Sequence, residues 1–435
     1  MIFIVCLVVC LSFFGIVNLA FRKLKLNLVG KGAHPIGLFI ILQIFIFSFP
    51  GVIAVSFLSY DSFRYEVIED IKKFEIGIWY LYSIIVILFF LFLFIYFFKV
   101  KSFKPKLGII DKHFDYVLLS KVMVLLALAF LILKIYFQGE TPLLLLFKGQ
   151  PVEAYLLRVE MQRNSSSIRV PYIDTFIELL FVYQFLFVVY LSFIGVRLKF
   201  LLKGISFFIA LYALTYDLQK APFAILLLVV SFMALSIRGN FSQFLRLLFL
   251  VAITLFGFYF FIMDMDTTII LERILERAFL AQNQGFYHII NSIEPNEKYL
   301  FHGFYMINKF GVYPERADVD IIPLIYGSNT DIVNSNSYFL GQAWSMFGYW
   351  GLVFSPIIVS ISVFAYIKLF DVLIASFPVV FIPYAFYILP SMQLNQSLSY
   401  FLWGRQFVLD FISIAVVYFF VLFLYYSVRL CKRVN

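Results

Sequence analysis

Apolar runs of about 17 to 30 residues recur along the whole chain, separated by short charged segments. A helix needs about 20 apolar residues to cross the hydrocarbon core of a bilayer, and lipid admits only helices or closed barrels. Charged residues make up 14% of the 435 residues, whereas roughly 25% is usual in soluble domains. The runs therefore predict an all-α polytopic membrane protein, one helical domain over residues 1–435 with no separate soluble domain.

Positive charge is distributed unevenly between the segments that separate these runs. The segments after the odd-numbered runs hold 18 Lys and Arg against three acids, Asp111, Asp115 and Asp371. Loops rich in Lys and Arg face the cytoplasm, so the pattern predicts about eleven transmembrane helices, with the N-terminus outside and the C-terminus inside. The net charge of +9 then reflects orientation, and we expect no nucleic-acid partner.

The first run, residues 1–20, lacks the basic leader and the cleavage site of a signal peptide, so we expect it to remain as the first span. Two cysteines, Cys6 and Cys10, lie in this run, and Cys431 lies in the basic tail. This spacing predicts neither a disulfide framework nor a metal cluster.

Three long segments, 138–172, 264–336 and 391–405, fall on the predicted outer side. The largest lies between the apolar runs Phe241–Met263 and Tyr338–Ile367. A loop of this length is usually functional or disordered, and its helical pieces predict an ordered cap over a membrane-embedded site. Long loops on one side favour an enzyme or receptor that works at the outer face over a channel.

Arginine is the residue type that best indicates a site here, because its planar, permanently charged fork matches phosphate oxygens. Seven arginines lie in the long outer loops, where the charge rule disfavours them. An alternative for each is an ion pair on a solvated helix face, with Glu272 or Glu276 for example. The seven are Arg158, Arg163, Arg169, Arg273, Arg277, Arg316 and Arg405.

A polar tip joins two unusually short runs, Leu198–Leu214 and Ala221–Ile237. It holds Asp217 and Lys220, and Lys220 opens a helix, where an anion is favoured. An Asp217–Lys220 ion pair is the simpler interpretation. Lys134, near the end of another run, is expected to extend its amine to the membrane surface.

Other sequence patterns indicate little metal or nucleotide chemistry. His288 and His302 show no metal-binding spacing, and no glycine-rich phosphate loop is present. Aromatic residues on the outer half, Tyr287 among them, could stack on sugars. We therefore expect a metal-independent protein without a cofactor.

The segment Ser335–Ser360, SNSYFLGQAWSMFGYWGLVFSPIIVS, resembles the late span of Wzy-type O-antigen polymerases. In that family a small polar residue and an aromatic residue, here Asn336 and Tyr338, precede a helix that ends in an FGxxGL-like turn. The turn corresponds to Phe347, Gly348, Gly351 and Leu352. The layout of spans and long outer loops is also similar, although Lys220 stands where the family usually has arginine.

The resemblance implies a glycosyltransferase of the bacterial inner membrane that acts at the periplasmic face. It would polymerise oligosaccharide repeat units carried on undecaprenyl pyrophosphate by inverting glycosyl transfer, with a chain-length-regulating co-polymerase as a partner. Arg277 and Lys220 would bind the pyrophosphate, with Arg158 and Arg163 as further contacts. The general base stays open among Asp217, Glu272, His288 and His302.

Two other functions remain open at this point. An O-antigen ligase has similar topology but usually a histidine-containing motif before the late span, where this chain has Asn334 and Asn336. A lipid-linked oligosaccharide flippase would need cations that line a cavity through several spans.

Overall fold

The computed structural model describes residues 2–101, 115–163, 173–218, 221–257, 275–304, 307–327, 335–402 and 404–434. These residues are mostly helical, and they contain no β-strand beyond two isolated bridges. Six of the described helices are long and apolar enough to cross a membrane. The prediction of an all-α membrane protein is thus confirmed, whereas the number and direction of the spans stay predictions.

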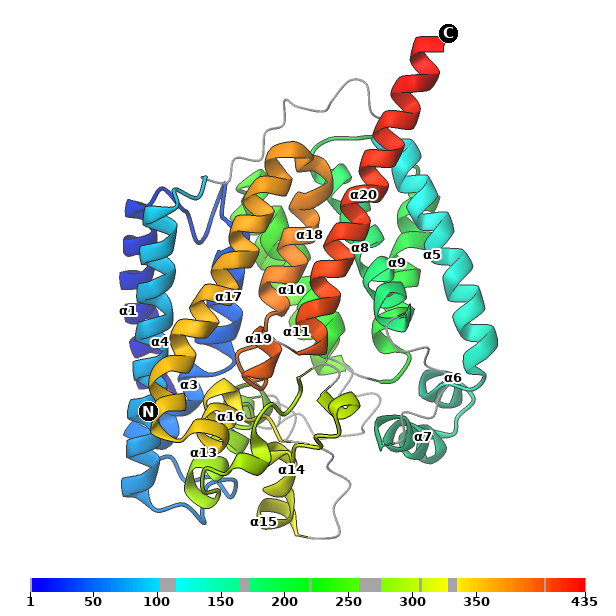
Figure 1. Cartoon of the computed structure of the whole chain (residues 1–435). Helices are drawn as coiled ribbons and strands as arrows, with labels where there is room; N and C mark the ends of the chain where they lie inside the picture. Colours follow the sequence, from blue (N-terminus) through cyan, green and yellow to red (C-terminus); the bar gives the residue numbers. More distant parts are fainter. Residues whose placement is uncertain are drawn as a thin grey trace.

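The helices run side by side as a bundle (Figure 1). The six long apolar segments are α1 (Ile2–Lys23), the segment Pro35–Phe57, α4 (Asp70–Phe97), α5 (Tyr116–Gln138), α8 (Ile173–Phe193) and α17 (Tyr349–Ser376). Shorter or partly apolar helices complete the bundle: α9 (Phe200–Thr215), α10 (Ala221–Arg238), α11 (Phe241–Gly257), α18 (Pro378–Ser391) and α20 (Arg405–Val434).

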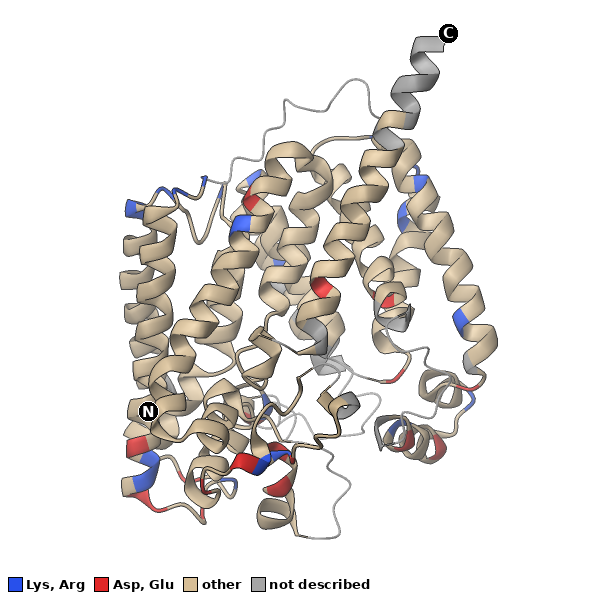
Figure 2. Cartoon of the chain, in the orientation of Figure 1, with Lys and Arg blue, Asp and Glu red and all other residues tan. Residues whose placement is uncertain are grey.

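Short helices gather at one end of the bundle, opposite the C-terminus (Figure 1). This end we call the cap end. Charged residues are also concentrated at the two ends, with many of the acids at the cap end (Figure 2). The short helices are α6 (Pro142–Phe147), α7 (Pro151–Arg163), η4 (Glu276–Leu280), α13 (Gln284–Ser292), η5 (Glu297–Tyr299), η6 (Ile307–Phe310), α14 (Ala317–Asp320), α15 (Ile322–Tyr326), α16 (Tyr338–Phe347) and α19 (Ser399–Leu402).

The second span is not a regular α-helix. It consists of α2 (Pro35–Phe39), the π-helix η1 (Ile40–Ile46), α3 (Phe49–Val52) and the π-helix η2 (Ile53–Phe57). Pro50, in the first turn of α3, cannot donate a backbone hydrogen bond, which favours a break before it. Just after this break the second span lies against η4. At Gly51 an added Cβ would lie 2.0 Å from the carbonyl oxygen of Phe279 in η4.

Helix α18 lies at the centre of the core, where it packs against α17, α2 and α8. Its polar partners come from neighbouring helices: Gln43 donates to the carbonyl of Pro390 at 2.9 Å, and the Tyr183 hydroxyl donates to the carbonyl of Val380 at 2.7 Å. The carbonyl of Pro390 lies in the last turn of α18, where a helix leaves its carbonyls without an internal partner, so Gln43 satisfies it.

The apolar run Tyr338–Ile367, counted as one span in the sequence, contains two helices, and the first ends at the FGxxGL-like turn. Gly348, with φ +58°, ends α16 and turns the chain into α17. Its amide donates to the carbonyl of Trp344 at 2.8 Å, which closes α16. The FGxxGL-like turn is therefore an elbow: Gly348 supplies the left-handed conformation, and Gly351 lets α17 approach the backbone of α16.

We expect Gly351→Ala to destabilise the protein. An added Cβ would lie 2.0 Å from the carbonyl oxygen of Ala343, so the elbow would have to open, at a cost of about 1–3 kcal/mol. Thermal unfolding in detergent should show a lower midpoint. Gly204→Ala in α9 is the matched control, because open space surrounds that position; an equal fall in both variants would contradict the role of the elbow.

Candidate functional site

Arg64, in the short loop before α4, is the centre of a buried polar network at the cap end. Its Nε donates to Glu276 at 3.0 Å, and its Nη1 donates to the Gln284 side-chain oxygen at 2.9 Å. The side chains of Arg64 and Glu276 are 10% and 14% exposed. The Tyr326 hydroxyl donates to the same Gln284 oxygen at 2.7 Å. Arg64 thus ties the loop between η2 and α4 to η4, α13 and α15.

Three amide side chains meet beside this network. Asn336, before α16, and Asn395, after α18, both donate to the side-chain oxygen of Gln282. Gln282 in turn donates to the backbone carbonyl of Arg277 at 2.9 Å. The backbone of Arg277 is therefore anchored, while its side chain is exposed and makes no hydrogen bond or ion pair with the described residues.

Several buried polar atoms of this region have no hydrogen-bond partner among the described residues. They are the side-chain oxygens of Asn283 and Asn395 and the side-chain nitrogen of Gln284. The orientation of Gln284 is fixed, because the Arg64 guanidinium can only donate and so must face its oxygen. Unsatisfied buried groups are rare and often lie at functional sites. Of these residues, Asn395 is connected to the backbone of Arg277 through Gln282.

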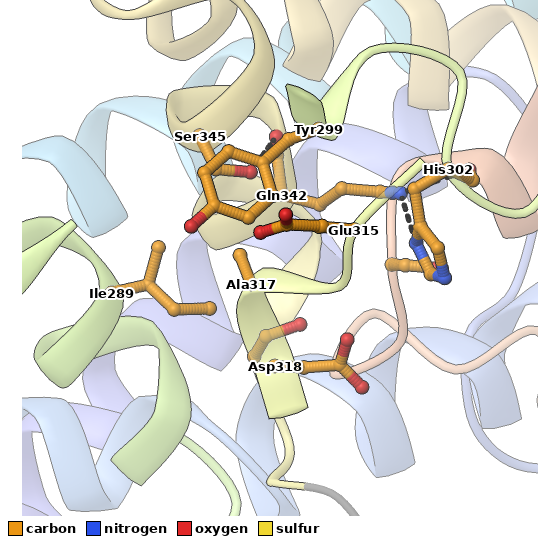
Figure 3. Close-up of a pocket in the computed structure, with 10 residues that line it drawn as sticks. Ile289, Tyr299, His302, Glu315, Ala317, Asp318, Gln342 and Ser345 are labelled. Carbon is orange, nitrogen blue, oxygen red and sulfur yellow. Dashed lines mark hydrogen bonds between the residues drawn. The ribbon is translucent and has the colours of Figure 1, made fainter. Parts of the chain in front are cut away.

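A second polar group surrounds His302 (Figure 3). Arg316 pairs with Asp318 at 2.6 Å, and both lie near His302. The Gln342 side chain donates to His302 Nδ1 at 2.9 Å. His302, Asp318 and Gln342 line a cavity of about 10 Å³, which is room for one water molecule and not for a sugar.

Two chain segments connect the His302 group to the amides. In the first, Asn336 bonds to Gln282, and its neighbour Ser335 donates to the carbonyl of Asp318 at 3.2 Å. In the second, Asn395 bonds to Gln282, and the Ser399 amide donates to the Gln342 oxygen at 2.8 Å. We call the amides, the Arg64 network and the His302 group together the cap site.

The hydrogen bonds define the neutral tautomer of each histidine. The Gln342 oxygen accepts from an amide N–H, so the Gln342 nitrogen faces His302 Nδ1, which must accept. His288 Nε2 lies 2.8 Å from the carbonyl of Arg64 and must donate. His288 is 2% exposed. In this arrangement His288 holds the Arg64 backbone, and His302 carries its proton on Nε2, so neither offers an accessible lone pair to a substrate.

Burial lowers the pKa of both His288 and His302. The unfolded chain, in which a histidine has a pKa of about 6.5, therefore binds more protons than the folded chain. The stability contributed by the neutral histidines is present above that pH and declines as pH falls below it. We expect a lower unfolding midpoint at pH 5.5 than at pH 8, and a smaller difference for the His288→Gln, His302→Gln double variant. An unchanged difference would contradict this origin.

The two aromatic residues singled out in the sequence are core residues. Tyr287 and Tyr338 are both 0% exposed. Their hydroxyls bond to Ser56 at 2.6 Å and Ser83 at 3.1 Å. In this structure their rings pack within the protein and do not face a surface where a sugar could stack.

The remaining predicted residues do not all converge. Arg158 is half-buried on α7, which lies apart from α13 and α16 (Figure 1), and Asp217 follows α9. Lys220, Arg169 and Arg273 lie outside the described residues, as does Glu272, and so do the side chains of Arg163 and Arg405. The Asp217–Lys220 pair therefore stays a prediction.

Lys134 does not extend to the surface, contrary to the sequence-based expectation. Its side chain is 7% exposed and pairs with Glu178 of α8 at 2.8 Å. The amine also lies 4.6 Å from the ring centre of Tyr216. An ion pair with a cation–π contact stabilises the charge within the bundle, so the lysine does not need to reach water.

Taken with the apolar helices, the cap site defines a helical membrane protein whose polar cluster lies at one end of the bundle. Comparison of the chain with protein-family models, with curated proteins and with solved structures finds no match. The function is therefore argued from the site and from the resemblance of Ser335–Ser360.

Proposed function

We propose that the protein polymerises undecaprenyl-pyrophosphate-linked oligosaccharide repeat units into a surface polysaccharide at the periplasmic face of the bacterial inner membrane. The observation that supports this most directly is Arg277, an exposed arginine without a partner among the described residues, whose backbone carbonyl accepts a hydrogen bond from Gln282 of the amide cluster. Arginine recognises phosphate oxygens. The elbow at Gly348 is the segment that resembles the family.

The reaction is an inverting glycosyl transfer. A hydroxyl at the non-reducing end of the acceptor unit forms a bond to the anomeric carbon of the donor glycan, and the bond from that carbon to the pyrophosphate oxygen breaks. The hydroxyl proton passes to a base, and undecaprenyl pyrophosphate leaves. Negative charge develops on the leaving group, and fixed cations stabilise it; this is the role we give to Arg277 and, on the sequence argument, to Lys220.

Surface polysaccharide from a strain that lacks the gene tests this function. We expect a single repeat unit on the core in the deletion strain and restored long chains after complementation. Loss of all repeats would instead indicate a ligase or a flippase. A partner that sets chain length is part of the proposal, and its removal should change the length distribution without abolishing polymer.

The proposed orientation places the cap site outside the cytoplasm. Its basis is the distribution of Lys and Arg, with positive charge concentrated in segments away from the cap end (Figure 2). Reporter fusions after Val29 and Lys106 should behave as cytoplasmic, and fusions after Ser165 and Glu297 as external. An external signal after Lys106 would overturn this orientation.

A further inference from the structure

A large groove lies between the first half of α1, the second span and η4. Its volume is about 740 Å³. Cys6 and Cys10 of α1 form one wall, Phe45 and Ala54 of the second span form the facing wall, and Phe279 belongs to η4. The groove thus exists because the irregular second span stands away from α1 at this level.

The groove is apolar along its walls and polar at one end only. That end, the mouth, includes Asp61, Ser62 and Glu276. Towards the opposite end the rings of Phe13, Phe45 and Phe49 pack together, with centroids 5.2 to 5.9 Å apart. An occupant must therefore be a long apolar chain with a polar group at one end.

The length of the groove along α1 matches one leaflet of a membrane. Its lining runs from Ile2 to Cys10, a rise of about 12 Å at 1.5 Å per residue, whereas half of the hydrocarbon core is about 15 Å. Only 22% of α1 within its apolar window is buried, so this helix stands at the edge of the bundle. A lipid chain could enter from the membrane beside it.

The mouth of the groove meets the cap site. Glu276 lines the mouth and pairs with Arg64, whose guanidinium also lies 4.8 Å from the ring centre of Phe63. Arg277 is the next residue along η4 and is exposed. The mouth itself is lined by the carboxylates of Asp61 and Glu276, and two cations lie next to Glu276: Arg64 through its ion pair and Arg277 along the chain. A sugar linked through pyrophosphate requires cations for its phosphate oxygens and acceptors for its hydroxyls close together.

We propose that this groove binds the polyprenyl chain of the lipid-linked substrate and so sets its pyrophosphate at the mouth, beside Arg277. The identity of the lipid rests on the proposed function; the shape and polarity of the groove do not. Its volume holds roughly 25 carbon-sized groups, if each takes about the 30 Å³ of a water molecule. One apolar groove with one polar mouth fits a single chain, whereas a diacyl phospholipid would leave its second chain outside.

Photolabelling of the full-length protein in detergent tests the groove without requiring turnover. The probe is undecaprenyl pyrophosphate with a diazirine on the chain, and the labelled peptides are identified by mass spectrometry. We expect label in residues 2–10 and 45–63. Unlabelled undecaprenyl pyrophosphate should compete at least tenfold better than phosphatidylglycerol. Label elsewhere, or equal competition, would overturn the proposal, the second result marking a general phospholipid site.

Two groove-filling variants, Cys10→Trp and Ala54→Phe, come from opposite walls, and each should reduce labelling at least tenfold. The control is Val8→Trp, because Val8 lies on α1 with 55% of its surface exposed and outside the lining. Normal labelling of both folded groove variants would contradict the proposal.

If labelling occurs in the groove but the deletion strain makes long chains, the proposed function fails and the groove stands. If the deletion strain lacks long chains but label is elsewhere, the groove fails alone.

Discussion

Arg277→Ala should lower the rate of chain extension about 100- to 1000-fold while the protein stays folded in the membrane. Removal of one donor that stabilises a developing anion commonly costs about 2.7–4 kcal/mol of transition-state stabilisation. The side chain is exposed and without a partner among the described residues, so its loss should leave the unfolding midpoint unchanged. Polymer length in the complemented deletion strain and the rate with purified lipid-linked repeat units are the two measurements.

Arg277→Lys distinguishes charge from geometry. Lysine keeps the positive charge but loses the planar fork that binds two phosphate oxygens at once, so we expect an intermediate rate. Lys148→Ala is the control, since Lys148 is an exposed cation on the same end of the bundle and pairs with the exposed Glu140. Normal polymer from Arg277→Ala at normal expression would place the site elsewhere.

The helical bundle could be predicted from the sequence because lipid imposes one pattern, the long apolar run, on every span. The elbow could not be predicted from hydropathy, because no charge interrupts residues 338–367. Only Gly348 carries a signal, as a glycine that can end a helix in the left-handed conformation. The FGxxGL-like motif contains this glycine, but the sequence does not show that the motif forms an elbow, because that depends on how closely α16 and α17 approach.

Arg277 could be singled out from the sequence, whereas Arg64 could not. Arg64 lies in a short loop with several acids, where local ion pairs are the expected outcome. Its actual partners, Glu276 and Gln284, are 212 and 220 residues away, and no local pattern links such positions. Asp410 was missed as well, although an acid that is 4% exposed within the apolar part of α20 is a signal in itself.

The roles of the histidines also depend on partners that are distant in the sequence. The sequence offers His288 and His302 as possible general bases, and both lie in the cap site, but a proton acceptor needs a free lone pair. Which ring nitrogen is free depends on the carbonyl of Arg64 and on the side chain of Gln342. Both partners come from distant parts of the chain, so residue type alone could not assign the role.

Arg64→Ala is the second substitution with a large expected effect, and it acts through folding. It leaves the nearly buried Glu276 carboxylate without its ion pair and removes the donor to Gln284. Breaking a buried pair from one side typically costs about 3–5 kcal/mol. We expect a markedly lower unfolding midpoint, together with loss of polymer, because η4 carries both Glu276 and Arg277.

Removal of both charges together distinguishes the stability that the Arg64–Glu276 ion pair contributes from that of the other contacts in the network. In Arg64→Met with Glu276→Gln no buried charge is left alone, so most of the lost stability should return. Chain extension should return as well if Arg64 only positions η4, and should stay low if its guanidinium contacts the pyrophosphate. Equal midpoints for the single and double variants would contradict a stabilising pair at this place. The hydrogen bonds from Tyr65 to the carbonyl of Leu280 and from Gln282 to the carbonyl of Arg277 would then be the contacts that hold η4.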